Sequence, residues 1–259
     1  MSEHLTHGWE PDLADDDSLL RAYVRGNAVR TCAMAERGGG RAARWDEVTA
    51  ADPRSPFVFD NMAVLLQPPE YVDLPSVVAR LEAFYPPERH YCFLSPFPTP
   101  DLRDYGWHLM GHPPVMLRPA GGSAPPPPPE LRLEPVDAAN VEVFLTTLVE
   151  AYPVPSAPVA QVAPAWLADD LKLFIGYVGD EPVGTAGARL GHGIVDVEWV
   201  STYPRFRGRG YGAALTWAAT LASPGDPAML IASDDGQPVY ERMGYLRLLR
   251  MTLWHRPPR

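Results

Sequence analysis

Residues 203–215 read YPRFRGRGYGAAL, and this short stretch is the most specific signal in the 259-residue chain. It follows a predicted strand at 194–202 and opens a predicted helix at about 210–222. Glycines at alternate positions let main-chain N–H groups turn toward one point without side chains in the way. The first turn of the helix adds N–H donors and a partial positive charge. The stretch therefore predicts an anion site suited to a diphosphate.

Three arginines within this stretch, Arg205, Arg207 and Arg209, supply counter-charge for such an anion. A nucleotide P-loop is excluded because no Gly-Lys-Ser/Thr follows the glycines. A dinucleotide fingerprint fits poorly, since position 213 is alanine and several residues separate the strand from the first glycine. The alternative is a plain glycine-rich turn with solvated arginines. The strand before it and the helix after it disfavour that interpretation.

The sequence around this stretch predicts a mixed sheet. Three strands linked by hairpins and then by crossover connections imply an α/β arrangement with helices on the faces of the sheet. The expected elements are strand 131–136, helix 138–151, strands 171–178, 182–189 and 194–202, helix 210–222, strand 228–232, helix 236–243 and strand 246–254.

Two motifs in this half resemble those of the GNAT superfamily of acyl-CoA-dependent N-acetyltransferases. The acyl-CoA signature of that family, Arg/Gln-x-x-Gly-x-Gly/Ala, is met by Arg207, Gly210 and Gly212. Residues 230–245, LIASDDGQPVYERMGY, are similar to the family's closing stretch, with a tyrosine on the last helix. The resemblance covers about half of the chain. It implies a GNAT-like fold, acetyl-CoA as co-substrate without a metal, and acetyl transfer to a primary amine by direct attack in a ternary complex.

The resemblance also implies which residues hold the coenzyme. The pantetheine arm is expected to pair with the backbone at the end of the strand, and the diphosphate is expected at the turn and the start of the helix. These residues are Val200, Ser201 and Thr202 on the strand, then Arg205, Arg207, Gly208, Arg209, Gly210, Tyr211 and Gly212.

Two side chains are expected to be catalytic. Glu198, on the strand before the turn, is the candidate base, with Asp196 as a competing candidate and a solvent-facing carboxylate as the bland alternative. Alternation places Asp196, Glu198 and Val200 on one face of the strand unless a bulge intervenes. Tyr240 is expected to stabilise the leaving sulfur by a hydrogen bond, the alternative being a packed core tyrosine. The sequence names no oxyanion stabiliser.

A proline-rich segment, 119–130, divides the chain into expected domains at 1–118 and 131–259. We interpret it as a semi-rigid linker. The first domain is expected to be disordered over residues 1–14. It then follows the order helix 15–35, strands 41–49 and 56–66, helix 74–84, strand 91–95, a helical turn at 102–106 and strand 114–117.

This order loosely parallels the second half, and the prediction is two tandem GNAT-like domains. In the first half, Pro68 and Pro69 stand where the coenzyme turn would be, and prolines lack the N–H groups that hold phosphate. We therefore expect a degenerate first domain that does not bind CoA in the usual way.

Composition restricts the remaining possibilities. The sequence contains no run of 18 or more apolar residues, so no membrane span is expected. A net charge of −10 argues against nucleic acid as the main partner. The first residues lack a secretion signal, so we expect a cytoplasmic protein. Two cysteines suggest neither a disulfide framework nor a metal cluster. The expected partners are acetyl-CoA and an amine, either a small molecule or a protein lysine or N-terminus. A CoA-binding regulatory or sensor protein without turnover is the alternative, and the oligomeric state stays open.

Overall fold

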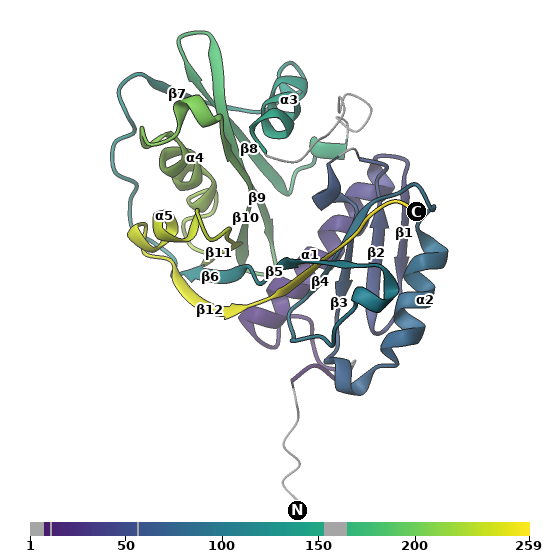
Figure 1. Ribbon diagram of the computed structural model, residues 1–259. Coiled ribbons are helices and arrows are strands. Elements are labelled where there is room, and N and C mark those ends of the chain that lie inside the picture. The colour runs from purple at the N-terminus through teal and green to yellow at the C-terminus, as the bar shows by residue number, and fades with distance from the viewer. Residues whose placement is uncertain (1–7, 11, 56, 153–164) are drawn as a thin grey trace, which may run out of the picture. The chain divides into compact units, whose positions relative to one another are not determined.

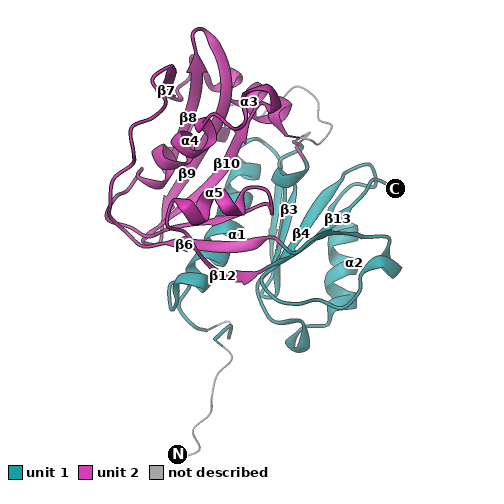
Figure 2. Ribbon diagram, turned by 60° about the vertical axis from the view of Figure 1, so that its left-hand side comes forward, with its two compact units in different colours: residues 1–54, 58–112, 251–259 teal, residues 55–57, 113–250 magenta. Residues whose placement is uncertain are grey.

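The computed structural model describes residues 8–10, 12–55, 57–152 and 165–259. The chain divides into two compact units, shown in separate colours in Figure 2. Unit 1 comprises residues 1–54, 58–112 and 251–259. Unit 2 comprises residues 55–57 and 113–250. Each unit has its own sheet, and both sheets contain parallel and antiparallel pairs, so the prediction of a mixed α/β fold is confirmed.

The described residues of unit 1 form two α-helices and a six-stranded sheet of order β1-β2-β3-β4-β13-β5. Strand β2 is buried along its whole length because helices cover both faces of the sheet. Cys32 and Ala35 of α1 pack on one face, and Val77 and Leu81 of α2 pack on the other. The helices and strands are α1 (Leu19–Arg37), β1 (Arg41–Arg44), β2 (Val48–Asp52), β3 (Met62–Leu65), α2 (Leu74–Phe84), β4 (Tyr91–Ser95), β5 (His108–Gly111) and β13 (Thr252–Arg256). Short 3-10 helices lie at Val58–Asp60, Pro69–Tyr71 and Arg103–Tyr105.

Unit 2 contains a seven-stranded sheet of order β12-β6-β11-β10-β9-β8-β7. Figure 1 shows α3 and α4 on opposite sides of this sheet. The helices and strands are β6 (Pro114–Arg118), β7 (Leu131–Pro135), α3 (Val141–Ala151), β8 (Leu171–Val178), β9 (Glu181–Gly191), β10 (Ile194–Thr202), α4 (Tyr211–Thr220), β11 (Ala228–Ile231), α5 (Gln237–Arg242) and β12 (Leu246–Arg250). A 3-10 turn, Pro204–Phe206, connects β10 to the glycine-rich stretch.

Local sequence explains how β8, β9 and β10 form a meander. His192 and Gly193 both have positive φ, at 52° and 66°, which is the backbone of a two-residue type I′ hairpin turn between β9 and β10. Gly184 lets helix α4 approach the sheet, because a Cβ there would lie 3.1 Å from Leu215 Cδ1. The meander and α4 together fix where the end of β10 meets the start of α4.

Each sheet is completed by a strand from the other half of the sequence. Strand β6, predicted as the last strand of the first domain, lies between β11 and β12 in the sheet of unit 2. Strand β13, at the C-terminus, lies between β4 and β5 in the sheet of unit 1. The predicted strand 246–254 is therefore wrong as a single element, since it is two strands in two sheets. The units also differ from the predicted domains 1–118 and 131–259 at these two strands.

The proline-rich segment 119–130 connects two strands of the same sheet. It leaves β6 and ends at β7. In the strand order, β7 is one edge strand of this sheet and β12 is the other. Near its start, the N–H of Gly121 donates to the carbonyl of Pro224 at 2.9 Å. The segment is therefore a connection within unit 2, and the interpretation as a linker between domains is corrected.

The N-terminal segment is anchored by one buried arginine. The Arg21 guanidinium donates to the carbonyls of Gly8, Glu10, Leu13 and Ala14 over 2.8–3.3 Å. The expected disorder of residues 1–14 does not hold for these four, while residues 1–7 lie outside the described part. The predicted helix 15–35 begins later, at Leu19, and Ser18 caps it, because its side chain accepts from the N–H of Arg21.

Three expectations from composition bear on the described residues. Both cysteines are buried free thiols, as predicted. None of the described helices combines the length and the apolar character that crossing a membrane requires. Within the described ranges, no three His, Cys, Asp or Glu side chains are arranged to hold a metal ion.

A partly buried carboxylate joins the C-terminal strand to α2 in unit 1. Glu82 accepts from Arg256 at 2.7 and 3.2 Å and from the indole N–H of Trp107 at 3.2 Å, and it pairs with Arg259 at 2.9 Å. Burial raises the pKa of Glu82, but hydrogen bonds from Arg256 and Trp107 and the charges of Arg256 and Arg259 lower it more. The net pKa is below the ordinary value, so the ionised form stabilises the fold.

Replacing Glu82 by Gln is expected to lower the free energy of unfolding by about 1–3 kcal/mol, because Arg256 then keeps a buried guanidinium without its carboxylate. In the wild type, this stabilisation is complete above pH about 4.3 and is lost as the pH falls through the lower folded pKa. Urea unfolding of both proteins between pH 3 and 7 measures the difference.

Glu36→Gln is the matched control. It removes an exposed ion pair with Arg44 on the same unit, and such pairs contribute at most about 1 kcal/mol. Equal losses in the two variants would contradict the role given to Glu82.

Candidate active site

The central feature of unit 2 is the point where β10 leaves β11. The two strands run parallel but pair only at Val195 with Ala228 and at Asp196 with Met229. β10 continues to Thr202, whereas β11 continues to Ile231 in contact with β6. Among the described strands, none pairs with this edge of β10 beyond Asp196. A ligand that carries amide groups fits such an edge, because main-chain N–H and C=O groups offer it strand-like pairing.

A β-bulge lies in this part of β10. Glu198 pairs with Gly187 of β9 and Ser201 pairs with Thr185, so two residues of β10 stand opposite one residue of β9. Within the bulge, Trp199 has φ 55°, a left-handed conformation that costs a bulky residue on the order of 1–3 kcal/mol.

The bulge changes which side chains share a face. Val200 packs in the core cluster that contains Val195 and Val197, so it lies on the face opposite to Asp196 and Glu198. The alternation that groups Val200 with the two carboxylates therefore fails. Its physical reason is the extra residue, which reverses the in–out order of every position after it.

The glycine-rich turn and the start of α4 lie directly after β10. Gly208 and Gly210 have φ of 75° and 81°, which glycine adopts without a Cβ penalty. Ala214 is the first residue of α4 whose N–H reaches a carbonyl of the turn, that of Gly210, at 3.0 Å. Helix geometry thus leaves the N–H groups of residues 211–213 for another acceptor. These donors and the helix dipole make the predicted anion site physically sound.

The end of β10 and the start of α4 are in close contact. A Cβ at position 212 would lie 3.0 Å from Thr202 Oγ1, so Gly212 permits the approach. Tyr211, the first residue of α4, is buried, and its hydroxyl donates to Glu130 at 2.7 Å. Pro128 lies on the other side of the turn, with Cγ 3.5 Å from a Cβ built on Gly210. No sequence signal predicts that Pro128 and Glu130 adjoin the turn, because the contact depends on the path of 119–130.

Arg207 has a structural contact in addition to any ligand role. Its Nε donates to the carbonyl of Thr202 at 3.1 Å and its Nη2 donates to the carbonyl of Ala151 at 3.4 Å. Ala151 is the last residue of α3, where a positive charge is favourable. Arg207 therefore fixes the end of β10 to the end of α3.

The other two arginines also contact the protein. Arg205 forms an ion pair with Glu181 at the surface. Arg209 places its guanidinium carbon 5.4 Å from the ring centre of Phe206. The three arginines keep the surroundings of the turn positive, while the groups free to bind an anion are the main-chain N–H groups.

The predicted catalytic side chains are brought together from different elements. Tyr240 lies on α5, half-buried, and Glu198 lies half-buried on β10 just before the bulge. Burial raises the pKa of Tyr240 to about 12, and the negative charge of Glu198 contributes to this rise. The two groups are therefore close enough to influence each other electrostatically. Asp196 is buried, at the last position where β10 pairs with β11.

Aromatic side chains that the sequence did not single out as a group cover the bulge. The Trp199 indole lies 4.6 Å from that of Trp166, and Trp166 lies 5.7 Å from Phe144 of α3. Gly187 leaves room for Trp199, since a Cβ there would lie 2.7 Å from Trp199 Cε3. These contacts join residues far apart in sequence, and residue type alone gave no signal for them.

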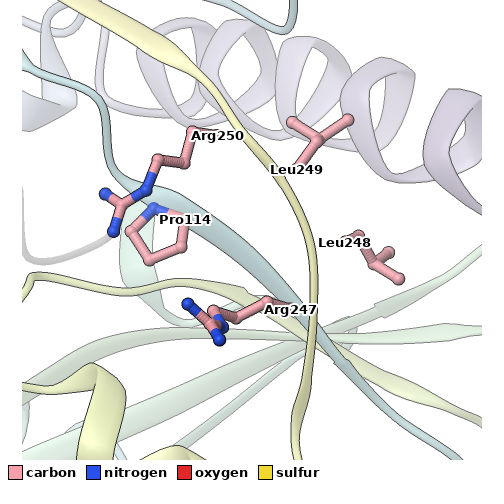
Figure 3. A pocket seen from close by; sticks show the side chains of 5 residues that line it. All are labelled: Pro114, Arg247, Leu248, Leu249 and Arg250. Atoms are coloured by element: carbon pink, nitrogen blue, oxygen red, sulfur yellow. The ribbon is translucent and has the colours of Figure 1, made fainter.

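One hollow on the surface of unit 2 lies elsewhere. It has a volume of about 360 Å³ and is lined by Pro114 and residues 247–250 of the edge strand β12 (Figure 3). A second hollow, of about 270 Å³, lies beside Trp166 and β8. Neither is lined by any residue of the predicted coenzyme site. The predicted coenzyme site is defined here by the strand edge and the helix start.

Comparison with known proteins now gives the family of this site. The model of the acetyltransferase (GNAT) family matches residues 140–245, which include β10, the glycine-rich turn, α4 and α5. This segment is a GNAT domain. No match to a curated protein was found.

Solved structures resemble the chain over a longer range than the GNAT domain. A GCN5-related N-acetyltransferase from Kribbella flavida is 21% identical with a TM-score of 0.61, and the alignment covers 89% of this chain and 95% of that one. A functionally unknown conserved protein from Staphylococcus epidermidis is 16% identical with a TM-score of 0.60, and the alignment covers 84% of this chain and 93% of that one. A GCN5-related N-acetyltransferase from Sphaerobacter thermophilus is 15% identical with a TM-score of 0.55, and the alignment covers 82% of this chain and 77% of that one. At these identities the likeness concerns the fold, and it extends beyond the GNAT domain to both sheets.

The left-handed backbone of Gly210 in the turn gives a stability prediction. Gly210→Ala is expected to lower the free energy of unfolding by about 1–2 kcal/mol, because an alanine at φ 81° is strained. Gly225→Ala is the matched control, with no atom within 4 Å of the added methyl and no positive φ, and it should be neutral or slightly stabilising. Urea unfolding of the two variants measures both values, and equal stability would show that the turn relaxes.

Proposed function

We propose that the GNAT domain binds acetyl-CoA and transfers its acetyl group to a primary amine by direct attack in a ternary complex. The observation that carries this proposal is the edge of β10 beyond Asp196, where β10 separates from β11 and leads directly into the N–H groups at the start of α4. A ligand with two amides and a diphosphate at one end matches this sequence of groups. The main chain of Val200, Ser201 and Thr202 pairs with the pantetheine arm, and residues 208–212 hold the diphosphate.

The amine must lose a proton before it reacts. For a lysine-like amine of pKa about 10.4, deprotonation at pH 7 costs about 4.6 kcal/mol. Bound acetyl-CoA supplies an activated acyl carbon and a thiolate leaving group. Glu198 accepts, directly or through water, the proton that the ammonium loses before its nitrogen attacks the acyl carbon. The second N–H proton leaves to solvent as the tetrahedral adduct collapses, the C–S bond breaks and the thiolate departs. Its half-buried position next to Tyr240 favours Glu198 over the buried Asp196 for this role.

Tyr240 stabilises the departing sulfur as a hydrogen-bond donor. Its pKa of about 12 lies about 3.5 units above that of a thiol near 8.5, so complete proton transfer to the thiolate would cost about 5 kcal/mol. The phenol therefore keeps its proton, and the thiolate takes its proton from solvent after release. The raised pKa guarantees that the donor is present throughout the physiological pH range.

We propose that unit 1 is a degenerate GNAT-like half that does not hold the coenzyme. Its parallel strands β3 and β4 stay paired at three consecutive positions, from Met62 with Cys92 to Val64 with Leu94. Helix α2 begins after Asp73, whose carboxylate accepts from Ser76 at 2.5 Å. A closed strand pair and an acidic side chain at the helix start disfavour an anionic ligand.

A binding and turnover assay tests the main proposal. CoA is expected to raise the melting temperature of the full chain, as a ligand of the folded state does, whereas ATP is not. Acetyl-CoA with a panel of small amines and lysine peptides should release free thiol only when an amine is present. Absence of CoA binding would overturn the proposal, and tight binding without release for any amine would favour a CoA sensor.

A pH profile tests the role of Tyr240. Because its pKa is raised to about 12, the active protonated form persists as the pH rises, and kcat should not fall between pH 8 and 10.5. Tyr240→Phe should lower kcat about 10- to 100-fold with little change in the KM for acetyl-CoA. Glu198→Gln should instead weaken the rise of kcat/KM with pH. A falling limb near pH 9–10 that disappears in Tyr240→Phe would contradict the raised pKa, whereas an unchanged kcat in Tyr240→Phe would contradict the donor role.

A further inference from the structure

The bulge of β10 is held by one side chain from the neighbouring strand. Thr185 is fully buried in the middle of β9, and it pairs with Ser201 at the end of the bulge. Its hydroxyl donates to the carbonyl of Trp199 at 2.8 Å and lies 2.7 Å from the hydroxyl of Ser201. Both contacts are made by a single oxygen, and they fix the two ends of the bulge relative to each other.

The contact to Trp199 gives the bulge a hydrogen bond from a side chain of the neighbouring strand. A bulge leaves its extra residue outside the regular ladder, so the carbonyl of that residue needs another donor when it is buried. The side-chain hydroxyl of Thr185 is this donor. In a regular ladder, only the main chain of Thr185 would bond to the neighbouring strand. A threonine here is therefore more than a β-branched residue filling a strand.

Two glycines beside Thr185 leave room for the bulge of β10. Gly184 lies against the bulge, because a Cβ there would approach the carbonyl oxygen of Ser201 to 2.4 Å. Gly187 lies under the Trp199 indole, with a Cβ built there at 2.7 Å from Trp199 Cε3. Two glycines and one threonine thus stand in a four-residue stretch of β9, opposite the bulge. The sequence GTAG at 184–187 is complementary to the irregular backbone of β10.

We infer that Thr185 is a positioning residue for the coenzyme site, a role that rests on the proposed function. The left-handed backbone at Trp199 determines which N–H and C=O groups of residues 199–202 face the edge where β10 separates from β11. It also sets the face on which Glu198 lies relative to the residues after it. Thr185 touches neither the amine nor the coenzyme, and it acts by holding this edge in the shape that the pantetheine amides require.

Valine in place of Thr185 removes the hydroxyl and keeps the shape of the side chain. Thr185→Val is expected to raise the dissociation constant of CoA, measured by calorimetry on the full chain, about tenfold. The KM for acetyl-CoA should rise by a similar factor, while kcat at saturation changes less than threefold. Amide hydrogen exchange of residues 199–202 should be faster in the free variant, which reports on the bulge without any ligand.

Thr185→Ser is the conservative variant and should restore wild-type affinity within about twofold, because it keeps the oxygen. Thr31→Val is the matched control. Thr31 is also buried and its hydroxyl lies 3.1 Å from two carbonyls, those of Asn27 and Ala28 of α1 in unit 1, so it should leave CoA affinity unchanged.

The inference is overturned if Thr185→Val binds CoA as tightly as the wild type with unchanged exchange, or if Thr185→Ser loses as much affinity as valine. Should Thr185→Val not fold, Gly187→Ala tests the same bulge by displacing the Trp199 indole, and it should weaken CoA binding. Unchanged CoA affinity in a folded Gly187→Ala would then count against the inference. If the wild-type chain does not bind CoA at all, the proposed function is refuted. If the wild type binds CoA and Thr185→Val binds it equally well, only the role of Thr185 is refuted.

Discussion

Main-chain hydrogen bonds between segments far apart in the sequence hold both sheets together. Strand β13 has partners on both sides in the sheet of unit 1, and β6 has partners on both sides in the sheet of unit 2. An inner strand satisfies the N–H and C=O groups of two neighbours, so removing it would expose two ladders rather than one edge. Each unit therefore needs a segment from the other half of the chain to be complete, and the two halves of the sequence are not two independent folding domains.

This exchange also supports the proposed coenzyme site. Beyond Met229, β11 has lost β10 as a partner and is held by β6 on its other side, through Ile231. The opening between β10 and β11 is thus stabilised by a strand that comes from before the proline-rich segment. A site that the local motif places at the turn depends, for its open edge, on the pairing of residues 115–118.

The electrostatic design of the site relies more on dipoles than on side-chain charge. The arginines of the turn contact Thr202, Glu181 and Phe206, whereas the helix start offers N–H groups that no helical carbonyl uses. Main-chain donors are already fixed by the helix, so they require no reorganisation when an anion binds. Burial and the charge of Glu198 act in the same direction on Tyr240, and both keep its phenol protonated.

The sequence by itself determined the elements of residues 131–245 and the glycine-rich turn, whereas the joint role of that turn and Tyr240 stays a prediction. These signals are local: alternation, hairpin glycines and a helix start lie within a few residues of one another. The sequence did not determine the partners of strands 114–118 and 252–256, because any apolar strand offers the same ladder to several sheets. It also missed the bulge at Trp199 and its contact with Thr185. Only the tertiary structure decided these features, since they depend on hydrogen bonds between strands whose register no single segment encodes.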